Sequence, residues 1–173
     1  MGADAEGLLR PLLDFMAAGG PVLWVIFGVS VLLWALIAER YWYLLVGFPR
    51  LAAELQARWS RRADQRSWAA RRIREALVSQ GRQALEARLA VLAALVALCP
   101  LLGLLGTVSG MIHVFDAIAF VGTGSSRTMA SGISRATLPT LAGMVVGIGG
   151  LWFSARLRQG ARRRARELAD ALT

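Results

Sequence analysis

The chain has 173 residues, of which 56% are hydrophobic and 18% charged, and its net charge at neutral pH is +9. Charged residues are nearly absent from three long apolar stretches, which leave little length for a soluble core. This distribution argues against nucleic acid as the partner of the positive charge. It predicts an all-α integral membrane protein with three transmembrane helices in a lipid bilayer, and with long helices that extend into the cytoplasm.

The charges also predict an orientation. Eleven arginines and five acids lie between the first and second apolar stretches, and six arginines and two acids lie in the tail from Arg156. The segment before the first stretch and the connection between the second and third carry few basic residues. Because basic segments stay in the cytoplasm, we expect the amino terminus outside and the carboxyl terminus inside.

Residues 1–20 form an amphipathic segment that ends at Gly19-Gly20-Pro21 and is expected on the outer side. It either lies along the membrane face or simply leads into the first transmembrane helix, predicted over residues 21–46. That apolar run has no basic leading region and no small-x-small cleavage site, so a retained anchor is expected rather than a signal peptide. Its helix should continue past Ala38 through Tyr41-Trp42-Tyr43, an aromatic belt at the cytoplasmic interface.

Residues 47–88 are predicted as a cytoplasmic connection of one or two helices, the last of which runs into the second span without a break. Apolar residues recur there at helical spacing among arginines, as at Leu51, Leu55 and Trp59. Helices of this kind bind RNA or anionic lipid in some proteins. A solvated helix face together with the cytoplasmic bias of basic residues is the simpler explanation.

Small residues form one stripe on each of the next two apolar helices. The stripes are Cys99, Gly103, Gly106, Gly110 and His113 on the second, and Thr140, Gly143, Gly147, Gly150 and Ser154 on the third. Glycine lowers helix stability, so both stripes indicate close packing. The partner is either the other helix of the same chain, a neighbouring subunit or a central helix.

Two hydroxyls, those of Thr107 and Thr140, lie within these stripes. A threonine in lipid usually bonds to a carbonyl of its own helix, and that is the simplest expectation for both. Pro100 and Pro139 each lack an N–H and so leave one helical carbonyl without its partner, which either kinks the helix or holds water.

Few ionisable residues lie near these helices. His113 and Asp116 are close to the outer end of the second span and are expected at the interface, and Arg135 can extend outward from the start of the third. One histidine, one cysteine and no clustered carboxylates supply neither a nucleophile–base pair nor a metal-ligand set. We therefore expect no enzyme activity, no cofactor and no metal.

Two segments resemble a known family. PLLGLLGTVSGMIHVFDAI, from Pro100, and MASGISRATLPTLAGMVVGI, from Met129, resemble the second and third spans of the MotA/TolQ/ExbB proton channel family. The resemblance covers about residues 89–158, before a basic tail of residues 159–173, and is greatest to the short ExbB-type subunits of TonB-linked systems. It implies a pore-facing role for Thr107 and Thr140, which align with the family's pore threonines.

The resemblance also implies partners and a location. Five copies would surround a pair of helices from an ExbD/TolR-like single-span protein in the bacterial inner membrane, with a TonB-like protein as a further candidate partner. Proton entry would then drive work on an outer-membrane process. The chain departs from the family at Arg135, where a glutamate is common, and arginine does not titrate in proteins. A non-conducting scaffold that assembles a single-span partner is therefore the alternative.

Overall fold

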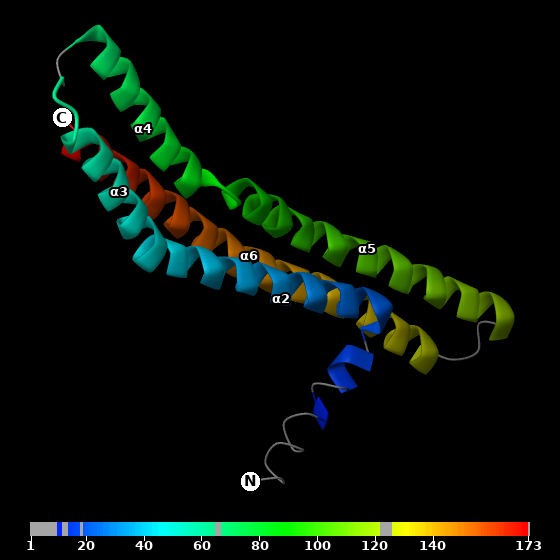
Figure 1. The fold of residues 1–173 in the computed structure, drawn as a ribbon. Helices are drawn as coiled ribbons and strands as arrows, with labels where there is room; N and C mark the ends of the chain where they lie inside the picture. Colours follow the sequence, from blue (N-terminus) through cyan, green and yellow to red (C-terminus); the bar gives the residue numbers. More distant parts are fainter. Residues whose placement is uncertain (1–9, 12–13, 18, 65–66, 122–125, 173) are drawn as a thin grey trace, which may run out of the picture. The chain divides into compact units, whose positions relative to one another are not determined.

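The computed structural model describes residues 10–11, 14–17, 19–64, 67–121 and 126–172 (Figure 1). Within these residues the secondary structure is helical and contains no β-strand. The helices are α2 (Gly20–Trp42), the π-helical segment η1 (Tyr43–Gly47), α3 (Phe48–Ser60), α4 (Trp68–Glu86), α5 (Leu89–Val121) and α6 (Ser126–Ala171). The predicted all-α fold is confirmed.

Three helical stretches of the described chain are long and apolar enough to cross a membrane. They are Gly20–Ser60, Trp68–Asp116 and Ala136–Ala171. Large apolar side chains on these stretches lie on the surface, and Trp24 and Val145 are 53% and 72% exposed. Such extensive apolar surface suits a lipid environment and not water, so the prediction of three transmembrane helices is also confirmed.

The first apolar helix continues beyond Ala38 through the aromatic group, as expected, and then changes its winding. The backbone N–H of Phe48 donates to the carbonyl of Tyr43, five residues back. Pro49 follows at once and has no N–H to continue the ordinary pattern of bonds four residues apart. The chain thus passes through the wider η1 turn immediately before Pro49.

The prediction that the helix before residue 89 runs into the second span without a break is wrong. α4 ends at Glu86 and α5 begins at Leu89, and the short non-helical stretch between them is visible in Figure 1. Arg88 has a φ of 64°, in the left-handed region that side chains rarely adopt. The Arg88 side chain forms an ion pair with Glu39. No glycine or proline marks the break in the sequence.

The chain divides into two compact units: Met1–Leu33 with Leu95–Gly150, and Trp34–Ala94 with Leu151–Thr173. In the second unit α3, α4 and α6 meet at Gly81. A Cβ atom at Gly81 would overlap the Leu168 side chain and lie 3.5 Å from Leu55 Cδ1. Both leucines are buried. The helical spacing of apolar residues in the arginine-rich segment thus reflects an apolar contact among three helices.

Arg74 of α4 binds the carboxyl end of α6 in the same unit. Its Nε donates to the Leu172 carbonyl at 3.1 Å, and its Nη2 donates to the Ala169 carbonyl at 2.9 Å. The last carbonyls of a helix lack partners within the helix and carry partial negative charge. The guanidinium satisfies two of them and joins α4 to the end of the chain.

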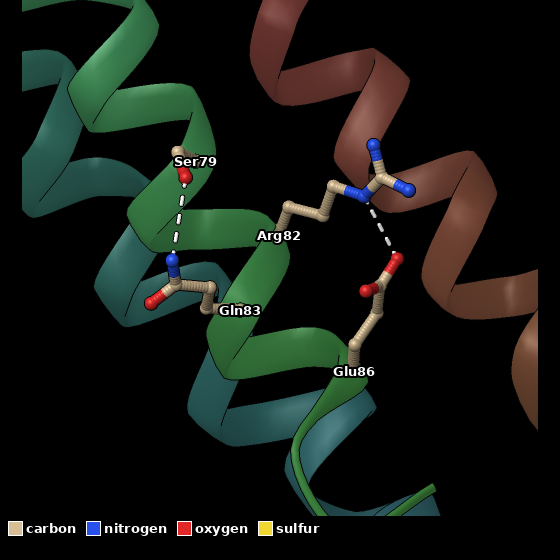
Figure 2. Close-up of polar contacts among 4 residues, drawn as sticks. All are labelled: Ser79, Arg82, Gln83 and Glu86. Atoms are coloured by element: carbon tan, nitrogen blue, oxygen red, sulfur yellow. Dashed lines mark hydrogen bonds and ion pairs between the residues drawn. The ribbon is translucent and has the colours of Figure 1, made fainter. Parts of the chain in front are cut away.

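The exposed face of α4 is held by pairs one turn apart (Figure 2). Arg82 Nε donates to Glu86 Oε1 at 2.8 Å, and Gln83 Nε2 donates to Ser79 Oγ at 3.4 Å. The hydrogen bond to Glu86, and then the negative charge of that carboxylate, raise the pKa of Arg82 above its ordinary value.

Candidate functional site

The glycine stripes of α5 and α6 lie against each other in the first unit. A Cβ atom at Gly103 would lie 2.9 Å from Thr140 Cα, and one at Gly110 would lie 2.7 Å from Ala136 Cα. The residue number falls on α6 as it rises on α5, so the two helices run antiparallel. Since these distances are too short for any side chain, glycine is what permits the two backbones to approach.

The contact extends to Gly143. A Cβ atom there would lie 2.5 Å from the carbonyl oxygen of Cys99 and 3.2 Å from Gly103 Cα. Gly103 and Gly143 are both buried. The centre of the α5–α6 contact, which we call the glycine seam, is therefore backbone against backbone.

Each proline packs on a glycine of the opposite helix. The Pro139 ring on α6 occupies the space that a side chain at Gly106 would need. The Pro100 ring on α5 lies 3.3 Å from the position of a Cβ atom at Gly147. Both prolines lie inside their helices, and Pro139 is fully buried. The rings fill the room that the glycines leave open.

The amino-terminal helix closes one side of the glycine seam. A Cβ atom at Gly150 would lie 2.7 Å from Leu33 Cδ2 and 2.8 Å from Val96 Cγ2. Val22 Cγ1 is 3.3 Å from the corresponding position at Gly106. All six glycines singled out from the sequence thus contact residues of the same chain.

Thr140 makes a side-chain hydrogen bond across this seam. Its Oγ1 donates to the Gly103 carbonyl of α5 at 2.9 Å, and the residue is half-buried. In a regular helix the same carbonyl accepts the N–H of Thr107. A carbonyl has two lone pairs and can accept both hydrogens. The Gly103 carbonyl can therefore serve as the acceptor for the Thr140 hydroxyl and for the Thr107 N–H.

Thr107 bonds within its own helix. Its Oγ1 donates to the Leu104 carbonyl at 2.7 Å, three residues back, and the residue is also half-buried. This is the usual way for threonine to satisfy its hydroxyl in a membrane helix. Each of the two oxygens keeps a lone pair that can accept a hydrogen from water or from a protonated acid.

Carboxylates are scarce near these hydroxyls. Asp116 and His113 are exposed toward the end of α5, and Asp116 is the only acid in that helix. Arg135 belongs to α6, and the structure describes its backbone but not its side chain. The described residues contain no group of three or more histidine, cysteine, aspartate or glutamate side chains that would hold a metal.

Two features of this region were not predicted from the sequence. The stripe pattern identified Thr140 and Gly103 separately, but helical periodicity says nothing about which residues of two helices oppose each other. The contacts of the folded chain set this register, in which Gly103 faces Thr140 and Gly110 faces Ala136. The packing of each proline on an opposite glycine was missed for the same reason.

Comparison with protein families gives a match for most of this chain. The model of the MotA/TolQ/ExbB proton channel family matches residues 49–170, which include both glycine-lined helices and the arginine-rich connection. A search of curated proteins gives no match.

Proposed function

The chain belongs to the MotA/TolQ/ExbB proton channel family, and we propose that it is an ExbB/TolQ-type subunit of a motor complex in the bacterial inner membrane. The complex uses the proton motive force to energise TonB-dependent or related transport across the envelope. The amino terminus lies outside and the basic carboxyl-terminal tail in the cytoplasm. The observation that carries the proposal is the pairing of Thr140 with Gly103 on two glycine-lined membrane helices.

The proposed mechanism assigns the two threonines to the proton pathway. Each hydroxyl donates to a carbonyl and keeps an acceptor lone pair in a segment that otherwise exposes apolar side chains. These oxygens would stabilise a water molecule or a protonated carboxylic acid on its way across the membrane. A charge that crosses 100 mV supplies about 2.3 kcal/mol, which is enough to bias the packing of one helix against another.

The titrating group would come from a partner. Neither α5 nor α6 places an acid beside the two threonines, and Asp116 is exposed near the end of α5. A single-span ExbD/TolR-like protein at the centre of a homo-oligomer, expected as a pentamer, would supply a membrane carboxylate. Arg135 would attract that carboxylate or hold it ionised, and a TonB-like protein would receive the work.

The second candidate is a scaffold that assembles the single-span partner without conducting protons. It is favoured by the fact that both threonine hydroxyls already have acceptors within the chain. In that case the hydroxyls serve packing alone, and Arg135 serves to hold the partner.

Proton flux separates the two candidates. The chain is co-expressed with an ExbD-like protein, and the purified complex is reconstituted into vesicles that contain a pH-sensitive dye. We expect Thr140→Ala and Thr107→Ala to lower flux severalfold while native mass spectrometry shows an intact complex. Ser109→Ala, which removes a neighbouring hydroxyl of α5, is the matched control and should leave flux unchanged. A complex that assembles but conducts nothing in its wild-type form would favour the scaffold.

A further inference from the structure

A pocket of about 340 Å³ lies in the second unit, between the end of the first apolar helix and the carboxyl-terminal part of α6. Its lining includes Tyr41, Leu44, Leu45, Arg156, Arg163 and Arg164. The volume is within the range of about 300–1,000 Å³ that small-molecule sites occupy. One wall is apolar and aromatic, and the other carries three guanidinium groups.

The guanidinium groups exceed the acids that face them. Glu167 pairs with Arg163 at 3.1 Å and with Arg164 at 3.7 Å. Arg156 makes no ion pair with any residue that the structure describes. The side chains of Arg163 and Arg164 remain 84% and 43% exposed. One carboxylate against three guanidinium groups leaves a positive site, and guanidinium binds phosphate oxygens in a bidentate manner.

The apolar wall lies at the end of the apolar run of α2. Tyr41 and Leu45 are 57% and 56% exposed, and they follow directly after the apolar run of α2. Arg156 is the first charged residue after the apolar run of α6. Aromatic and basic residues in this position contact lipid headgroups at the interface. A ligand with a charged head and a hydrocarbon body matches both walls.

Two backbone features shape the pocket. Gly160 forms part of its lining, and a Cβ atom there would lie 3.7 Å from Leu44 Cδ1. Leu44 and Leu45 belong to η1, whose wider turn changes the direction of these side chains relative to an α-helix. Single π-helical turns occur frequently at functional sites.

We propose that this pocket binds the phosphate headgroup of an anionic phospholipid, with the acyl chains beside Tyr41 and Leu45. The proposal goes beyond proton conduction and does not depend on it, because the pocket is formed by one chain. A soluble phosphate would share the arginine wall but would leave the apolar wall exposed. Basic pockets at the cytoplasmic ends of membrane helices are suited to anionic headgroups.

The test is native mass spectrometry of the full chain in detergent with equal amounts of phosphatidylglycerol and phosphatidylcholine. The wild-type chain should retain phosphatidylglycerol in preference. Arg156→Gln with Arg164→Gln should weaken this retention at least about tenfold, because each basic residue near an anionic headgroup contributes a severalfold factor. Arg162→Gln with Arg166→Gln removes the same charge from α6 outside the pocket and should retain the lipid.

A second variant keeps every arginine. Gly160→Leu fills the pocket beside Leu44 and should also abolish the preference, with helicity by circular dichroism as the check on folding. Equal weakening by both arginine pairs would show a general charge effect and overturn the proposal. So would equal retention of the two lipids by the wild type. Retention of inorganic phosphate or of a short RNA, with no preference for phosphatidylglycerol, would assign the arginines to a soluble anion or to nucleic acid instead.

Discussion

Thr140 on α6 donates its hydroxyl hydrogen to the carbonyl of Gly103 on α5, at 2.9 Å. The bond lies where the two backbones are in close contact, because a Cβ atom at Gly103 would lie only 2.9 Å from Thr140 Cα. A directional bond at a close backbone contact fixes the rotation and the register of both helices. The hydroxyl thus has a structural effect in addition to any part in conduction.

Replacement of Thr140 by valine keeps the shape of the side chain and removes the bond. Hydrogen bonds between membrane helices contribute about 0.6 kcal/mol on average and at most about 1.7 kcal/mol. We expect a loss of stability in that range, measured by unfolding in mixed micelles. Thr140→Ser retains the donor and should lose less. Equal losses for valine and serine would show that the methyl group matters and the bond does not.

Gly103→Ala should disrupt the glycine seam. The new methyl group would meet the backbone of Thr140 and the Pro139 carbonyl at 3.1 Å, and neither can rotate away. We expect a loss of about 1–3 kcal/mol, the usual cost of overpacking, seen as a lower melting temperature in detergent. Gly28→Ala is the matched control, because a Cβ atom there meets nothing within 4 Å. A control that destabilises as much as Gly103→Ala would contradict the proposed contact.

Arg74→Met should fray the end of α6. It leaves the carbonyls of Ala169 and Leu172 without the donors seen here, and a lost bond to a charged group costs about 1.5–3 kcal/mol. Hydrogen exchange of residues 166–172 should accelerate. Arg72→Met removes an arginine of the same helix whose ion pair with Glu75 is 67% and 68% exposed, and it should change exchange little. Unchanged hydrogen-exchange protection of these residues in Arg74→Met would show that the Arg74 hydrogen bonds do not stabilise the end of α6.

The left-handed backbone conformation of Arg88 predicts which of two substitutions, alanine or glycine, gives the more stable protein. Both Arg88→Ala and Arg88→Gly lose the ion pair with Glu39, so they differ mainly in backbone freedom. We expect the glycine variant to be more stable by about 1 kcal/mol. At Gln80, inside α4 and exposed, the order should reverse, and alanine should be more stable than glycine by a similar amount. The same order at both positions would mean that Arg88 does not require a positive φ.

Periodicity and charge together predicted the helical class, the three membrane segments and the continuation of the first helix past Ala38. Those properties depend on the preference of each residue for water or lipid, and this preference follows from the residue type alone. The break at Arg88 was not predicted because none of its neighbours disfavours a helix. The Arg88 side chain pairs with Glu39, 49 residues away, and no local pattern reports such a partner.

The same distinction applies to the candidate site. The glycine stripes identified which faces of α5 and α6 pack closely, because glycine marks close approach wherever it is placed. They did not show that Pro139 opposes Gly106, since relative register is a property of two helices and not of one. The pocket beside Arg156 was also missed, because its two walls are more than 100 residues apart in the chain.

The close approach of Gly103 and Gly143 has a further consequence for how an ion could cross. A Cβ atom at Gly143 would lie only 2.5 Å from the Cys99 carbonyl, which leaves no space for a water molecule at the centre of the seam. The interior of one subunit is therefore dry at that level. A continuous wire of water could form only along an outer face of these helices, where another chain supplies the opposite wall. An isolated copy would then conduct no protons, because the close packing of α5 and α6 would prevent proton leakage when no partner is bound.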